Sequence, residues 1–168
     1  VARYPDRLNV MHAARMAARQ DGADQLLLLD EQDRSLWDAG EIATGLSWLA
    51  RSAQGTVFTR YHAEAGMAAE HCMAPTFAQT RWDRIVECYE LLERVTPSPL
   101  HTLGKALAVA EQLGPARGLA VLDGFDPPAG LADSYLCLSV LADLHQRCGH
   151  PEVARRHRVA ALASAPSP

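Results

Sequence analysis

Apolar residues recur at helical spacing along most of the chain, most clearly in the segment that begins at Arg81. There they occupy positions i, i+3, i+4, i+7 and i+10, which lie on one face of a helix: Trp82, Ile85, Val86, Tyr89 and Leu92. Thr80 can cap the first turn. Pro97 ends the segment, because the residue before a proline is driven out of the helical conformation. The spacing therefore predicts an amphipathic helix here.

The rest of the C-terminal half reads as further helices separated by glycine and proline. Ser98 is a favourable N-cap and Pro99 suits the first helical position, so a helix is expected from there to Gly114. The helices expected after it span 115–125, 131–148 and 151–163. Within the second of these, an inward-facing set is predicted: Leu131, Tyr135, Leu138 and Leu141.

The N-terminal half follows the same pattern less regularly. Helices are expected around 7–19, after Arg34 and over 58–72, with a loop at 73–79. The helix after Arg34 carries one apolar side: Trp37, Ile42, Leu46 and Leu49. The short apolar run 26–29 is compatible with an extended segment or a buried helical turn, and periodicity does not decide between them.

Weak self-similarity accompanies these helices. Gly114 and Gly149 each end one helix and precede another, about 35 residues apart, close to the tetratricopeptide period. We therefore predict an all-α fold of about eight helices, with antiparallel hairpins stacked as a short tetratricopeptide-like array. The expected divisions are an N-terminal helical part over 1–79, the hairpins over 80–163, and a frayed tail over 164–168.

Composition narrows the classes of function. The 168 residues carry a formal net charge of −4 and show no dense cluster of Lys and Arg, so direct DNA binding is not expected. No apolar run is long enough to cross a membrane. The four cysteines form no C-x-x-C pair and are interpreted as reduced, as in a cytoplasmic protein. The chain starts at Val1 without a visible secretory signal, which is expected of a fragment.

Several strings identify a more specific relationship. Those in the first half are 9–15, 27–37 and 42–46, and the most specific is Leu-x-x-Gln-Asp-Arg-x-x-Trp, which ends at Trp37. Later strings keep the same order: 61–65, 82–89, 96–99, 106–110 and 114–119. Together they resemble the C-terminal extension of one group of extracytoplasmic-function RNA polymerase sigma factors. One departure is Gly104-Lys105, where that family usually has Asn-Arg.

The resemblance implies a role in controlling transcription initiation. Family members carry two promoter-recognising sigma domains upstream of such an extension, and neither is present here. The expected partners are therefore the sigma domains of the same parent chain, RNA polymerase or a regulatory protein. Two alternatives remain: a free-standing helical-repeat adaptor, which an upstream in-phase reading frame for sigma domains would exclude, and a small-molecule sensor with its ligand near Trp37, His62 and Trp82.

The best candidate site is Gln32-Asp33-Arg34 with Trp37. Arg34 could form a bidentate ion pair and Trp37 could anchor a partner. Alternatively, Asp33 caps a helix while Arg34 and Trp37 dock it on its neighbour, and we favour this second interpretation. The further candidates for interaction or domain docking are His62, Trp82, Pro97, Ser98 and Pro99.

Metal and catalytic sites are not expected. His145, Cys148 and His150, with His71 and Cys72, could be imagined around zinc, but they lack the paired ligand clusters of structural zinc sites. They are interpreted as core residues at a repeat junction, and His62 as a buried, hydrogen-bonded histidine. No motif for nucleophilic catalysis or phosphate binding occurs. We therefore expect a protein that is not an enzyme and carries no cofactor.

Overall fold

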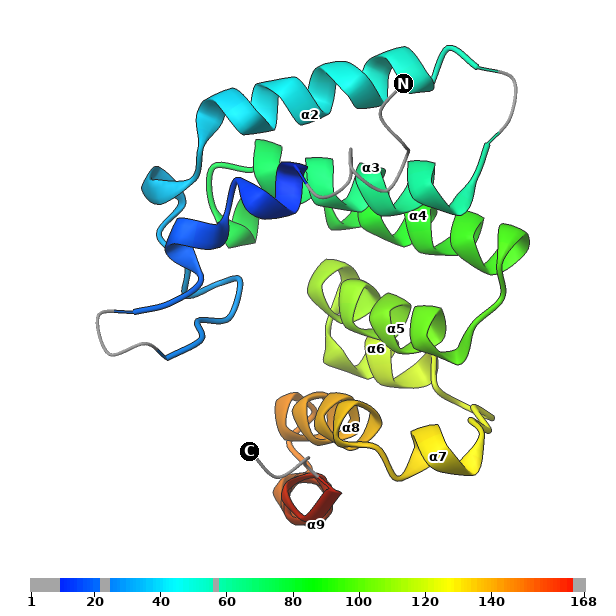
Figure 1. Ribbon diagram of the computed structural model, residues 1–168. Helices are drawn as coiled ribbons and strands as arrows, with labels where there is room; N and C mark the ends of the chain where they lie inside the picture. The colour runs from blue at the N-terminus through cyan, green and yellow to red at the C-terminus, as the bar shows by residue number, and fades with distance from the viewer. Residues whose placement is uncertain (1–9, 22–24, 56–57, 165–168) are drawn as a thin grey trace. The chain divides into compact units, whose positions relative to one another are not determined.

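Short helices separated by capped turns make up a computed structural model of the chain, which describes residues 10–21, 25–55 and 58–164 (Figure 1). After a helical segment at 10–13, the α-helices are α2 (Ala39–Ser52), α3 (Arg60–Met73), α4 (Trp82–Val95), α5 (Pro99–Leu113), α6 (Pro115–Ala120), α7 (Ala129–Ala132), α8 (Tyr135–Arg147) and α9 (Pro151–Ser164). Three 3-10 turns lie between them: η1 (Met16–Ala18), η2 (Arg34–Leu36) and η3 (Phe77–Gln79).

The predicted all-α class is confirmed. Over the described ranges there is no β-strand, and the extended pairing is an isolated bridge between Gln20 and Leu26. The run 26–29 is thus not a buried helical turn, and Leu26 and Leu28 are exposed. Among the helices that the structure describes, none is long and apolar enough to span a bilayer.

The chain divides into two compact units, an N-terminal unit (Val1–Val95) and a C-terminal unit (Thr96–Pro168). This division lies later than the 79/80 boundary expected from the sequence, because α4 packs on α3 and belongs to the first unit. The tail expected to fray begins at Ser164, which is the last residue of α9, and 165–168 lie outside the described residues.

The N-terminal unit is built from α2, α3 and α4, with α3 packed against both others. Its core cluster centres on Met11, Ala68 and Ala69. Gly45 of α2 faces the same Met11, and a Cβ placed there would lie 2.5 Å from the Met11 Cγ. Small residues on α2 and α3 therefore bring these helices close to the segment that precedes them.

The C-terminal unit consists of two stacked helical hairpins, α5–α6 and α8–α9. Both helices of the first hairpin contact α8, and they share one core: Leu103, Ala106, Ala110, Leu122, Cys137, Val140 and Leu144. The predicted glycines Gly114 and Gly149 adopt positive φ values of 95° and 76°, which glycine tolerates without strain. Arg147 of α8 binds Glu111 of α5 at 2.6 Å and joins the two hairpins.

Several details of the sequence-based helix assignment are wrong. The helix expected over 115–125 ends at Ala120, and Trp37 lies before α2 rather than on it. The helix expected over 131–148 is interrupted, because the Ser134 hydroxyl accepts from the Cys137 N–H and donates to the Leu131 carbonyl, so α8 starts at Tyr135. Tyr135 is consequently half exposed rather than inward-facing. Thr80 does not cap α4, since its hydroxyl is buried without a hydrogen-bond partner.

Candidate functional site

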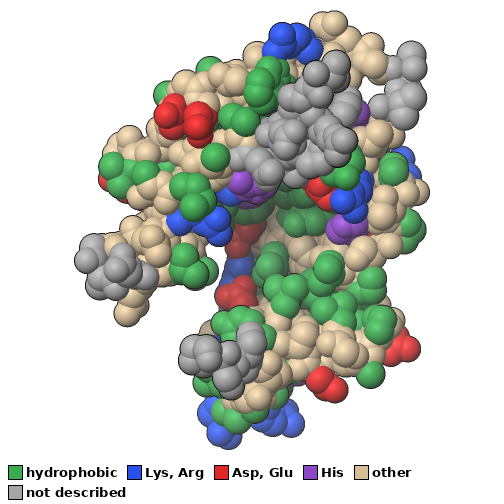
Figure 2. Space-filling view, viewed as in Figure 1, with side chains coloured by type: hydrophobic (Ala, Val, Ile, Leu, Met, Phe, Trp, Pro, Cys, Tyr) green, Lys and Arg blue, Asp and Glu red, His purple; other side chains and the backbone are tan. Residues whose placement is uncertain are grey.

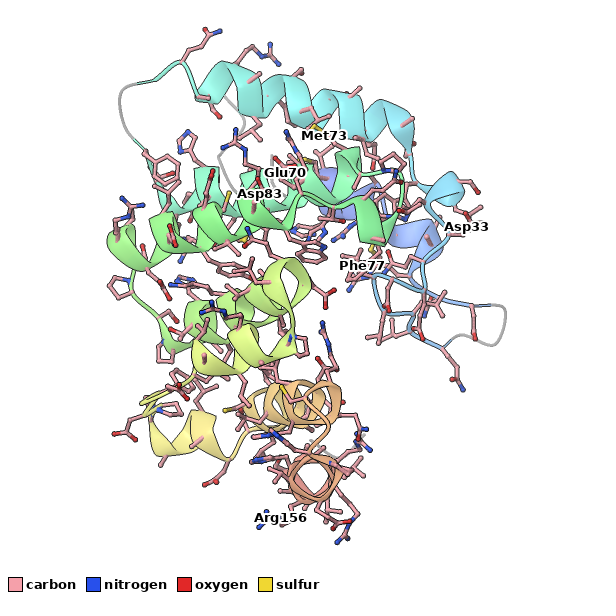
Figure 3. All side chains as sticks on the ribbon, turned by 180° about the vertical axis from the view of Figure 1, so that it is seen from behind. Asp33, Glu70, Met73, Phe77, Asp83 and Arg156 are labelled. Carbon is pink, nitrogen blue, oxygen red and sulfur yellow. The ribbon has the colours of Figure 1, made fainter. Side chains whose placement is uncertain are left out.

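The turn that contains the predicted Gln32-Asp33-Arg34 motif is fixed by its own side chains. The Asp33 carboxylate accepts from the Ser35 backbone N–H at 2.9 Å and from the Ser35 hydroxyl at 2.7 Å. These hydrogen bonds lower the pKa of Asp33, which stays ionised as the cap of η2. Gln32 donates through Nε2 to the Leu27 carbonyl at 3.2 Å. Asp33 itself is exposed (Figure 3), which leaves Arg34 as the residue that points inward.

Arg34 docks this turn on the end of α3. Its Nη1 donates to the carbonyls of His71 at 2.5 Å and Ala74 at 2.8 Å. The last carbonyls of a helix have no partner within it and carry the negative end of the helix dipole, so a guanidinium is a favourable partner for them. The docking interpretation of Asp33 and Arg34 is therefore confirmed, and the described structure holds no bidentate pair between Arg34 and a carboxylate.

Two guanidinium groups flank the buried Trp37 indole. The Cζ of Arg34 lies 4.5 Å from the ring centroid and that of Arg15 lies 5.6 Å from it. Arg15 comes from the turn that follows the helical segment 10–13, and its Nη2 is 3.0 Å from the His12 Nδ1. Trp37 thus joins the N-terminal segment to η2 through cation–π contacts with both arginines.

His71 extends the cluster to α4. Its ring meets Trp82 edge to face at 5.3 Å, and Trp82 meets Phe77 in the same way at 5.1 Å. Burial, together with the positive charges of Arg15, Arg34 and His12, lowers the pKa of His71 to about 4. The imidazole is therefore neutral at pH 7. We call Arg15, Arg34, Trp37 and His71 the arginine–tryptophan cluster.

The sequence-predicted residues divide between this cluster and other places. Gln32, Asp33, Arg34 and Trp37 belong to its turn, and Trp82 touches it through His71. The remaining candidates lie at the starts of helices. His62 of α3 is buried, and its Nδ1 accepts from the Thr59 N–H at 3.1 Å. Ser98, which follows Pro97, caps α5, and Pro99 is the first residue of that helix. The buried, hydrogen-bonded His62 is as predicted.

Sequence reasoning missed Arg15 and the role of His71. The available signal for Arg15 is its place as the last residue of string 9–15, the first of the strings that carry the sigma-factor resemblance. The sequence suggests a role for His71 only as a metal ligand. No local pattern pairs residues 15, 34 and 71, because the fold alone brings them together.

His145 and His150, two of the residues that could be imagined around zinc, lie at the α8–α9 turn, whereas His71 belongs to α3. The Nδ1 atoms of His145 and His150 are 3.2 Å apart, and His157 stacks on His145 at 5.6 Å. His150 is exposed, so it is not the core residue expected. Across the part of the chain that the structure describes, no group of three or more His, Cys, Asp or Glu side chains is placed to hold a metal.

A pocket of about 310 Å³ opens beside the α3–α4 turn. Its lining is Glu70, Met73, Ala74, Pro75, Gln79 and Arg81. Glu70 and Arg81 already form a two-pronged ion pair, with both distances 2.8 Å, and Glu70 and Met73 project from α3 (Figure 3). The two charged groups that line the pocket are therefore paired with each other.

The pKa of His71 predicts acid sensitivity of the N-terminal unit. Because the folded pKa lies below the unfolded value near 6.5, the unfolded chain binds the proton more readily. The resulting stability is complete above pH 6.5 and is lost as the pH falls toward 4. We expect a loss of about 2 kcal/mol between pH 7 and 5, measured by urea unfolding with tryptophan fluorescence.

The matched variant for this measurement is His71→Phe, which keeps a ring against Trp82 and removes the titrating group. It is expected to show a shallower pH dependence than the wild type over the same interval. Equal slopes would contradict the assignment of the effect to His71.

Comparisons with known proteins match the segment that holds most of the cluster. Residues 8–53, which include Arg15, Arg34 and Trp37, match a family of unknown function (DUF6596). An uncharacterized protein of Rhizobium meliloti (strain 1021) is 34% identical over 116 residues, which cover 69% of this chain and 27% of that protein. No solved structure matches the chain. The chain thus spans about a quarter of the length of the relative that it resembles.

Proposed function

We propose that this chain is a regulatory protein-interaction region of an extracytoplasmic-function sigma factor. In this role it modulates transcription initiation by contacting the sigma domains of its own parent chain, and RNA polymerase or a regulator are further candidate partners. The ordered sequence strings support the assignment, and stacked helical hairpins are a common support for protein contacts. A net charge of −4 favours a protein partner over promoter DNA.

The observation that carries the proposal is the placement of large apolar side chains in the C-terminal unit. Alanines such as Ala106, Ala110 and Ala154 fill buried positions between its helices. Larger apolar residues are at least half exposed: Leu100, Leu113, Tyr135, Leu136, Val159 and Leu162. Figure 2 shows hydrophobic side chains gathered over the helices of this unit. Grouped apolar exposure of this kind is typical of a surface that another protein covers.

Helix α9 offers the most sharply defined part of this surface. Val159 and Leu162 are 60% and 70% exposed and stand three residues apart, so they share one side of the helix. The preceding turns carry Arg155, Arg156 and Arg158, and Arg156 projects away from the helix (Figure 3). This apolar and basic composition favours a partner segment that is apolar and acidic.

Promoter-directed transcription in vitro tests the proposal. Removing residues 1–168 from the full-length parent protein is expected to change the amount of transcript, because the sigma domains lose their regulatory contact. The paired substitution Val159→Glu with Leu162→Glu is expected to change it in the same direction, since it adds charge to the apolar side of α9.

The matched control is Ala116→Glu with Ala120→Glu, which adds the same charge to two exposed positions of α6. It should leave transcription at the wild-type level, with circular dichroism confirming that all variants keep their helix content. Transcript levels unchanged by the deletion would rule the proposal out.

A further inference from the structure

Three nitrogen atoms of the arginine–tryptophan cluster are buried without a hydrogen-bond partner: Arg15 Nε, Arg34 Nη2 and Trp37 Nε1. Each is an N–H group that can donate and cannot accept. Buried donors are almost always paired in folded proteins, because an unpaired one has lost its water without replacement. His71 Nδ1 and Gln32 Oε1 are also buried and unpaired. The three unpaired donors, two of them on guanidinium groups beside the Trp37 ring, point to an acceptor that belongs there.

The charge of the cluster also lacks a carboxylate partner among the described residues, and the α3 carbonyls are the groups that accept from Arg34. Among the described residues, the acidic side chains in ion pairs bind arginines other than Arg15 and Arg34, and Glu70 on the adjacent helix is held by Arg81. Burial lowers the pKa of both Arg15 and Arg34, since the charged form is costly away from water. A buried charge is normally paired, and in the described part of the chain neither guanidinium faces a carboxylate.

Docking alone does not account for these groups. It uses Arg34 Nη1, which binds the α3 carbonyls, and the face of the Trp37 ring. Arg34 Nη2, Arg15 Nε and the indole N–H take no part in it. An apolar side chain in place of Arg15 would contact Trp37 without any buried charge. These three donors each need a hydrogen-bond acceptor. Because two of them belong to guanidinium groups, an acceptor with negative charge suits them best.

We propose that the arginine–tryptophan cluster is a binding site for a small oxyanion, such as a phosphate or carboxylate group. The oxygens accept from Arg15 Nε, Arg34 Nη2 and Trp37 Nε1, and the two guanidinium groups neutralise the charge, a task that suits their fork of donors. Because the donors are covered, a neighbouring side chain moves when the anion enters, which makes association slower than diffusion. This site is independent of the proposed contact with sigma domains.

Nitrogen-15 NMR of the indole N–H groups tests the site on the chain itself. The three tryptophans give three signals, and Trp37→Phe assigns the signal of Trp37. Titration with sodium phosphate or sodium acetate is expected to shift that signal in a saturable manner, while Trp48 serves as the internal reference. Sodium chloride at equal ionic strength is expected to leave it in place. Tighter binding in one of the two arms identifies the phosphate or the carboxylate as the preferred group.

A thermal melt provides a second measurement. At about tenfold excess over Kd, the bound anion is expected to raise the Tm by about 3 to 6 °C. Arg15→Gln is expected to weaken binding at least about tenfold, the typical effect of losing a charged hydrogen-bond donor. Arg84→Gln, on the exposed side of α4, is the matched control and should bind as the wild type does.

If Arg15→Gln loses its helix content, Arg15→Lys replaces it, because lysine keeps the charge and lacks the Nε–H donor. It is expected to bind more weakly than the wild type. The proposal is overturned if neither phosphate nor acetate shifts the Trp37 signal beyond the chloride control. It is overturned equally if a folded Arg15 variant binds as tightly as the wild type, which would mean an adventitious ion only.

Discussion

Replacing Arg34 with methionine is expected to lower the free energy of unfolding of the N-terminal unit by about 3 kcal/mol. The substitution removes the hydrogen bonds to the His71 and Ala74 carbonyls, and a hydrogen bond from a charged group contributes about 1.5 to 3 kcal/mol. It also removes the closer of the two cation–π contacts on Trp37. Relief of the buried charge offsets part of this loss. All three tryptophans lie in this unit, so fluorescence during urea unfolding reports on it directly.

The matched control for this prediction is Arg84→Met. Arg84 lies on α4 in the same unit and pairs with Glu87 at 2.7 Å, with both side chains more than half exposed. Exposed pairs of this kind add little to stability, so no measurable change is expected. Arg34→Lys should fall between the wild type and the methionine variant, because lysine keeps the charge without the planar fork. Equal stability of Arg34→Met and Arg84→Met would contradict the docking role.

The sequence predicted helix ends well where the signal is local. Ser98 and Pro99 begin α5, and Gly114 and Gly149 stop helices with positive φ, since capping and left-handed turns depend on a few adjacent residues. Ser134 shows the limit of the method. Its neighbours continue the apolar spacing across the break, so periodicity favours one helix where a serine cap makes two.

Only the part of the candidate site that lies within one turn, Asp33 and Arg34, could be predicted from the sequence. Asp33 as a cap and Arg34 as a docking residue follow from the order of residues in one turn. Arg15 reaches the Trp37 indole, and His71 reaches the Arg34 guanidinium, from distant parts of the chain. No spacing rule predicts contacts of that kind. Unpaired donors are likewise a property of the folded state and become visible only with coordinates.

In the C-terminal unit, the buried residues are not always the most hydrophobic ones, and the reason is again packing between helices. Helix pairs in close contact admit small residues, so Ala106, Ala110 and Gly118 are buried while Leu113 and Leu162 are exposed. Hydrophobicity ranks leucine above alanine, whereas the distance between two helix axes decides which of them fits. The repeated pattern in the sequence therefore predicts the positions of the helices better than it predicts which residues are buried.

Replacing Gly118 with alanine is expected to destabilise the C-terminal unit by about 2 kcal/mol. A Cβ at this position of α6 would lie 2.5 Å from both the Ala106 carbonyl oxygen and the Ala110 Cβ. Those atoms belong to α5 and its backbone, so the α5–α6 hairpin must open to admit the methyl group. Overpacking of this kind costs about 1 to 3 kcal/mol or more, and the higher helix propensity of alanine returns up to about 1 kcal/mol. Urea unfolding followed by circular dichroism measures the difference.

Gly130→Ala separates the steric effect from helix propensity. Gly130 lies in the short helix α7 of the same unit, and no atom lies within 4 Å of a Cβ added there. The same substitution is therefore expected to leave stability unchanged or to raise it slightly, because alanine restricts the unfolded chain. If Gly118→Ala proved as stable as Gly130→Ala, α5 and α6 would not approach as closely as the hairpin requires. Since α8 packs on both of these helices, a wider hairpin would also displace α8, and the Arg147–Glu111 ion pair would be lost.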